Sequence, residues 1–122
     1  MSQQKLKLKF ASATALLLLI ATPAMSSDSK TVNGVTFTCV VTGSDSDGFQ
    51  VNTSYDGDKA WNCKASCRLT KGDKTTVEYN LPFSGNAVVH HGKGYLDGKG
   101  GLPGKPFSNP ELTKASCEPW KT

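Results

Sequence analysis

Residues 61–69 constrain the fold more than any other part of the chain, because their side chains alternate strictly in character. Apolar residues and two cysteines, Cys63 and Cys67, occupy every second position, and polar or charged residues fill the positions between them. A period of two is typical of a β-strand with one buried and one solvated face. Trp61 lies on the cysteine face, where we expect it to pack in the core against a disulfide. The run predicts a central strand of an antiparallel sheet.

Five further segments show the same apolar period or a shorter form of it, and turn residues such as Gly, Asn and Asp separate them. No amphipathic helix and no repeat interrupts this series. The chain is therefore predicted to be all-β, with the architecture of a small antiparallel immunoglobulin-like β-sandwich. The further strands predicted by the period are 35–41, 49–55, 77–81, 87–91 and 112–117.

The first 26 residues have the order of a cleavable signal peptide. Three lysines precede an uncharged stretch, residues 10–21, which is about a dozen residues long, whereas a bilayer span needs roughly 20. Small residues follow, and we expect cleavage after Ala24 or Ser26. Residues 27–122 would then form a single domain without a membrane anchor, located in the periplasm or secreted.

The formal net charge of +4 owes most of its value to this segment. Three of the 14 basic residues lie in it, so the rest of the chain carries 11 basic against 10 acidic residues. Nucleic-acid binding depends on a basic stripe that displaces counterions from phosphates. We therefore expect no nucleic-acid partner.

The apolar core is predicted to be thin, since the chain beyond the signal segment holds eight Val, five Leu, four Phe and no Ile. A domain of this size buries a smaller fraction of its surface on folding than a larger domain does, so it needs further stabilisation. Cys39, Cys63, Cys67 and Cys117 are an even number of cysteines behind an export signal, which predicts two disulfides. A zinc site is the alternative, but the cysteines lack a second close pair and a flanking histidine.

The pairing of these cysteines is narrowed by the strand at 61–69. Four residues along one strand separate the Cα atoms of Cys63 and Cys67 by about 13 Å, too far for a disulfide. Each must then bond to Cys39 or Cys117. Of the two remaining schemes we favour Cys39 with Cys63 and Cys67 with Cys117, on the expectation that the last strand lies beside the later half of the central one.

Residues 92–110 show no strand pattern, because they include six glycines and three prolines. They are predicted to form a long irregular loop. Exposed aromatic side chains on such a loop often contact a carbohydrate or protein surface, and aromatic side chains that cover the end of the sandwich are the equal alternative. The candidate binding residues in or near this segment are the aromatic residues Tyr95, Phe107 and Trp120 and the lysines Lys93, Lys99 and Lys105.

Catalytic motifs are not found in the sequence. His90 and His91 are the two histidines, and neighbours on a strand point to opposite faces, so they make a weak metal site. Residues 45–48 are similar to the opening of a calcium loop but lack its later acidic ligands, and they are interpreted as a turn. We expect no resident cofactor.

These observations favour an exported, non-catalytic binding module for a protein or carbohydrate ligand. A second hypothesis is an inhibitor or antagonist of another secreted protein that presents residues 92–110 as its contact. A third, from a different class, is a small metal-dependent hydrolase centred on His90 and His91. The chain is predicted not to be an enzyme.

Overall fold

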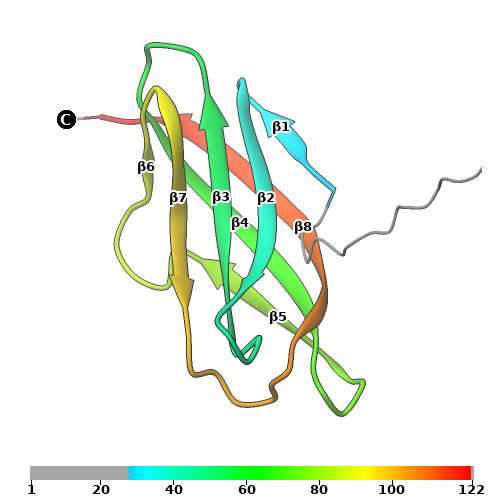
Figure 1. The fold of residues 1–122 in the computed structure, drawn as a ribbon. Coiled ribbons are helices and arrows are strands. Elements are labelled where there is room, and N and C mark those ends of the chain that lie inside the picture. Colours follow the sequence, from blue (N-terminus) through cyan, green and yellow to red (C-terminus); the bar gives the residue numbers. More distant parts are fainter. Residues whose placement is uncertain (1–27, 122) are drawn as a thin grey trace, which may run out of the picture.

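The structure, a computed structural model, describes residues 28–121. Eight strands in this part of the chain form two antiparallel sheets that face each other, as Figure 1 shows. The all-β prediction is therefore confirmed. The predicted signal segment, residues 1–26, lies outside the described residues, and its cleavage stays a prediction. Within residues 28–121, no helix has the length and hydropathy needed to cross a membrane.

The first sheet, in front in Figure 1, has the strand order β1-β2-β3-β7. Its first hairpin turns at Asn33 and Gly34, whose φ angles of 52° and 84° are the left-handed values that a two-residue hairpin turn requires. This sheet therefore has β1 and β7 at its edges. Its strands are β1 (Lys30–Val32), β2 (Val35–Thr42), β3 (Gly48–Tyr55) and β7 (Gly92–Lys99).

The second sheet is built around β4, the strand predicted from the alternating run. One side of β4 pairs with β8 along most of its length. The other side pairs with β5 over its second half and with β6 at its first two residues. The strands of this sheet are β4 (Trp61–Thr70), β5 (Thr76–Leu81), β6 (Val88–Val89) and β8 (Ser108–Pro119).

The core lies between the two sheets and uses the inward positions of their strands. Phe37, Phe49 and Leu69 are fully buried there, as the period of two predicts. Phe49 also stacks on Tyr79, with ring centroids 5.0 Å apart, and meets Phe83 edge-on at 6.0 Å. Aromatic pairs at such distances add stabilisation beyond burial of their area.

Two disulfides join the strands. Cys39 of β2 bonds to Cys67 of β4 and links the sheets, while Cys63 of β4 bonds to Cys117 of β8 within the second sheet. The prediction that Cys63 and Cys67 do not bond each other is confirmed, but the favoured pairing is wrong. β8 runs antiparallel to β4, so its end lies beside the beginning of β4, where Cys117 is directly opposite Cys63.

The prediction of an irregular loop over residues 92–110 is also wrong. Its first eight residues form β7, and β8 begins at Ser108, which leaves 100–107 as the connection. β7 is an edge strand held by backbone pairing with β3, which requires no apolar pattern. At Gly98 the strands approach so closely that a Cβ atom would lie 2.7 Å from the carbonyl oxygen of Phe49.

The connection at 100–107 is anchored to neighbouring turns by backbone hydrogen bonds. The N–H of Leu102 donates to Asp47 O, and that of Phe107 donates to Ser46 O, both at 2.9 Å. Phe107, one of the candidate binding residues, is 1% exposed and belongs to the core, so its place is covering the end of the sandwich. The connection carries two isolated large apolar side chains, Leu102 and Phe107, and a search for periodic apolar positions does not detect residues that are buried singly.

Trp61 differs in part from its predicted role. It is half-buried and packs at the rim of the core. Its Nε1–H donates to the hydroxyl oxygen of Tyr55 at 3.0 Å, and Lys59 Nζ lies 5.3 Å from the ring centroid. The side chain thus closes one end of the two sheets.

Peptide mapping of the unreduced protein should recover Cys39 bonded to Cys67 and Cys63 bonded to Cys117. Cleavage after Lys64 separates Cys63 from Cys67, so trypsin distinguishes the two schemes. Recovery of Cys39 bonded to Cys63 would show that the register of β8 on β4 is wrong.

Phe107→Ala should lower the free energy of unfolding by about 3–5 kcal/mol, because it leaves a cavity in a thin core. Lys105→Ala removes an exposed ion pair with Asp45 and should change stability little. Urea denaturation of both variants provides the comparison. Equal stabilities for the two would place Phe107 outside the core.

Candidate functional site

Tyr95 is the one large hydrophobic side chain that is exposed within residues 28–121, with 66% of its surface accessible. It lies on β7, directly opposite Asn52 of β3. The neighbours of Asn52 on β3, Val51 and Thr53, are buried, so alternation directs Asn52 and Tyr95 to the outer face of the first sheet. The phenol ring therefore stands on a regular strand and not on a loop.

On β2 and β3 the outer face beside Tyr95 is polar and uncharged, and the charged residues near the ring belong to β7. Gln50 and Asn52 are half-buried and linked, since Gln50 Nε2 donates to Asn52 Oδ1 at 2.6 Å. Threonines of β2 continue the face, and two of them hydrogen-bond to hydroxyls in or before β1: Thr36 to Thr31 at 3.0 Å and Thr38 to Ser29 at 2.8 Å. Amide and hydroxyl groups on a flat sheet offer both donors and acceptors to a ligand.

Two hollows adjoin Tyr95, which lines both of them. The larger, of about 400 Å³, also involves Thr42, Gln50 and Lys99. The smaller, of about 200 Å³, lies toward β6 and also involves His90 and Lys93 among its lining residues. The ring of Tyr95 therefore separates two spaces that each contain hydrogen-bonding side chains and a lysine.

Asp97 holds this part of β7 in place. The register of β7 on β3 shifts between Tyr95 and Gly98, which forms a bulge. The carboxylate of Asp97 accepts the N–H of Gly98 at 2.8 Å and the N–H of Phe83 at 3.1 Å. Phe83 follows β5 in the second sheet, and Lys99 Nζ lies 5.0 Å from its ring centroid. The bulge is thereby tied to the opposite sheet.

The two histidines lie near the smaller hollow and are exposed. Nδ1 of His91 lies 3.1 Å from the carbonyl oxygen of Asp56 and 3.3 Å from that of Gly57. Over the residues that the structure describes, no three His, Cys, Asp or Glu side chains come together as metal ligands. His90 and His91 therefore supply hydrogen-bonding groups to the smaller of the two hollows beside Tyr95.

The candidate binding residues predicted from the sequence lie in different parts of the structure. Tyr95, Lys93 and Lys99 share β7 and the two hollows. Lys105 lies in the 100–107 connection, where it pairs with Asp45 at 3.3 Å. Trp120 is half-buried, and its backbone N–H donates to Ala60 O at 3.0 Å, which attaches this part of the chain beside β4.

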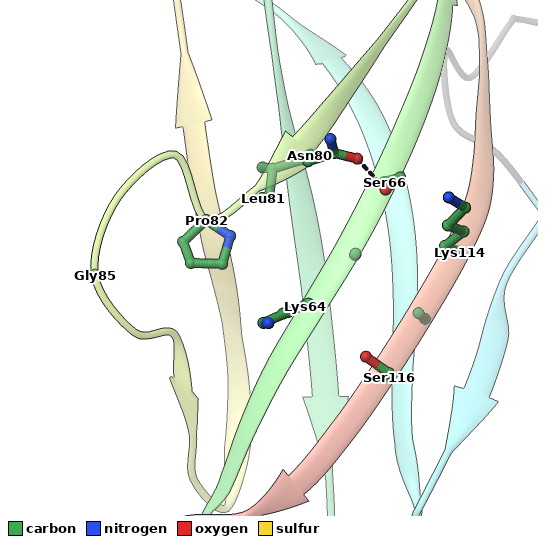
Figure 2. A pocket seen from close by; sticks show the side chains of 10 residues that line it. Lys64, Ser66, Asn80, Leu81, Pro82, Gly85, Lys114 and Ser116 are labelled. Atoms are coloured by element: carbon green, nitrogen blue, oxygen red, sulfur yellow. Dashed lines mark hydrogen bonds between the residues drawn. The ribbon is translucent and has the colours of Figure 1, made fainter.

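A third hollow, of about 490 Å³, opens on the outer face of the second sheet, as Figure 2 shows. Lys64, Ser66 and Lys114 are among its lining residues, and none of them was singled out from the sequence. The alternation at 61–69 places Lys64 and Ser66 on the wet face. Only the register of β8 brings Lys114 beside them.

Comparison with known proteins finds no matching family model, no similar curated protein and no similar solved structure.

Asp97→Ala should lower the free energy of unfolding by about 2 kcal/mol, because two backbone N–H groups lose a charged acceptor. Asp97→Asn keeps one acceptor oxygen and should lose less. Chemical denaturation measures both, and the exposed Asp58→Ala is the control. An Asp97→Ala variant as stable as the control would mean that the bulge does not depend on this carboxylate.

Proposed function

We propose that the chain is an exported, non-catalytic binding module, an immunoglobulin-like β-sandwich that binds a neutral carbohydrate at the surface around Tyr95. The observation that carries the proposal is the exposed ring of Tyr95 between two hollows. An aromatic face stacks on the C–H face of a sugar ring, and the exposed area of Tyr95 is large enough for that contact.

The side chains beside the ring support this ligand class. Gln50, Asn52 and Thr42 supply amide and hydroxyl groups, which match the many donors and acceptors of a sugar. The outer positions of β2 and β3 carry no charged residue, and Lys93 and Lys99 of β7 line the hollows as further donors to sugar hydroxyls. The two hollows would accommodate neighbouring sugar units on either side of the stacked one.

An exported location is consistent with the two disulfides, which form in oxidising compartments. The inter-sheet link from Cys39 to Cys67 also supports the immunoglobulin-like arrangement, since such folds often join their two sheets by one buried disulfide. Periplasm and secretion both satisfy this condition.

A panel of soluble neutral polysaccharides, screened by affinity electrophoresis and then by calorimetry, tests the proposal. Tyr95→Ala should weaken binding by roughly tenfold or more, because a central aromatic contact is lost. Tyr95→Phe keeps the ring and should bind nearly as well as the original chain. Lys105→Ala, at a residue that lines neither hollow, is the control.

Failure of every neutral polysaccharide to bind would overturn the carbohydrate assignment. Binding that Tyr95→Ala leaves unchanged would overturn the location. Capture of a protein in place of a sugar, weakened by Tyr95→Ala, would favour the antagonist hypothesis at the same surface.

A further inference from the structure

The hollow on the second sheet exists because β4, on the side away from β8, lacks a strand partner over a short stretch. β5 ends its pairing at Ala65, and β6 pairs only with Trp61 and Asn62. Beside Lys64, residues 82–86 leave the sheet and arch outward, as Figure 2 shows, and the chain returns to β4 where the N–H of Cys63 donates to Ala87 O at 2.9 Å. The floor of the hollow is therefore β4 and β8, and the arch is its wall.

Two lysines line this space from neighbouring strands; in Figure 2 the side chain of Lys64 points toward Pro82, whereas that of Lys114 extends along β8. Lys64 lies opposite Ser116, and Lys114 lies opposite Ser66, so the lysines are diagonal neighbours. Diagonal positions on an antiparallel pair place Cβ atoms roughly 7 Å apart, a distance that two lysine side chains can span to meet on one anion. Both side chains are exposed.

Neither ammonium group forms an ion pair with a carboxylate of residues 28–121. In the part of the chain that the structure describes, no carboxylate oxygen lies within 4.0 Å of Lys64 or Lys114. The nearby acids Glu78 and Glu111 are paired with Arg68, at 3.6 and 3.2 Å. The hollow thus holds two cations that form no ion pair, and the acid on the same face is Glu118, which is opposite Asn62 and diagonal to Lys64.

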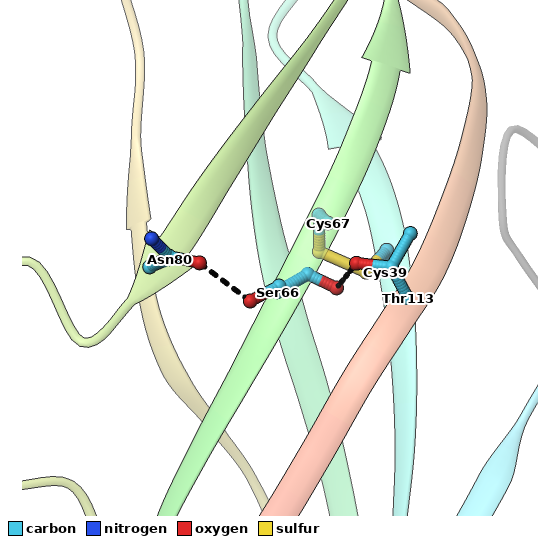
Figure 3. Close-up of a disulfide and its surroundings, with 5 residues drawn as sticks. All are labelled: Cys39, Ser66, Cys67, Asn80 and Thr113. Atoms are coloured by element: carbon cyan, nitrogen blue, oxygen red, sulfur yellow. Dashed lines mark hydrogen bonds between the residues drawn. A yellow bond between two sulfur atoms is a disulfide. The ribbon is translucent and has the colours of Figure 1, made fainter.

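Neutral donors complete the lining. The hydroxyl of Ser66 donates to Asn80 Oδ1 at 2.6 Å, which leaves the Asn80 amide N–H groups for another acceptor. Ser66 is 5% exposed, and its carbonyl oxygen accepts the hydroxyl of Thr113 at 3.2 Å. Figure 3 shows both bonds beside the disulfide of Cys39 and Cys67, so this side of the hollow is held rigidly.

An apolar surface is also present. Pro82 is half-buried, and its ring lies on the same side of β4 as Lys64 in Figure 2. A ligand with a compact ring could rest against Pro82 while its charged group reaches the lysines. The combination differs from the surface around Tyr95, where an exposed aromatic ring stands beside the amide and hydroxyl groups of β2 and β3.

We propose that this hollow is a second binding site, specific for a small organic carboxylate whose ring rests on Pro82 and whose anionic group lies between Lys64 and Lys114. Charge-assisted hydrogen bonds from ammonium to carboxylate are the strong contacts of such a site. The site is independent of the carbohydrate surface, which lies on the other sheet.

NMR titration of the isotope-labelled full chain tests the proposal with two matched probe pairs: glucuronate against glucose, and benzoate against benzyl alcohol. At least one acid should shift the backbone amides of residues 64–66 and 114–116, while its neutral partner leaves them unchanged. The effective pair tells whether the carboxylate belongs to a sugar or an aromatic ring. Added salt should weaken the binding.

The double variant Lys64→Gln with Lys114→Gln should weaken binding of that acid by about tenfold or more. Lys30→Gln removes an exposed lysine of the first sheet and is the matched control, expected to bind unchanged. Glu118→Gln should tighten binding, because Glu118 lies two residues after Ser116 on the same face as Lys64. Its negative charge would repel the carboxylate of the ligand. Thermal unfolding confirms that each variant is folded.

Absence of shifts with both acids would overturn the proposal, as would equal shifts with the neutral partners. Unchanged affinity in the double lysine variant would overturn it as well. None of these outcomes affects the Tyr95 surface, whose tests use neutral polysaccharides and a different variant.

Discussion

The disulfide between Cys39 and Cys67 is the covalent link between the two sheets, and the rest of the structure depends on it. The core between the sheets is thin, so burial alone stabilises the fold weakly. On the loop-entropy model the two disulfides, which join residues 28 and 54 positions apart, each contribute about 4 kcal/mol, against a total stability of about 5–15 kcal/mol for an ordinary domain. Because both bonds begin on β4, this strand positions β2 and β8.

Both proposed binding surfaces lie on strands with a fixed backbone, but different interactions hold the two strands in place. Tyr95 stands on an edge strand, and the bulge beside it is held by Asp97, which bonds across to Phe83 beyond the end of β5. Lys64 and Ser66 stand on β4 itself, next to Cys67. In both cases the side chains project from strands whose backbone is fixed by pairing. A ligand therefore meets groups that are already positioned, and binding requires little ordering of the chain.

The surfaces also differ in the charge that their strands carry. On β2 and β3 the outer face of the first sheet has threonine, serine and amide side chains, which suit a neutral ligand with many hydroxyl groups, and the lysines of that sheet lie on the edge strands β1 and β7. The outer face of the second sheet has cations on β4 and β8, and within residues 28–121 only Arg68 among them is paired with acids. A small domain with two such faces can hold two chemically distinct ligands without competition between them.

The sequence by itself determined the strands that have one buried and one wet face, because burial imposes a period of two. It also excluded a bond between Cys63 and Cys67, because an extended chain holds them too far apart. β7 was missed, since an edge strand rich in glycine is defined by its hydrogen bonds to β3 and not by apolar side chains. The disulfide pairing, the burial of Phe107 and the meeting of Lys64 with Lys114 depend on strand direction and register. Those are long-range properties, and only the tertiary structure decided them.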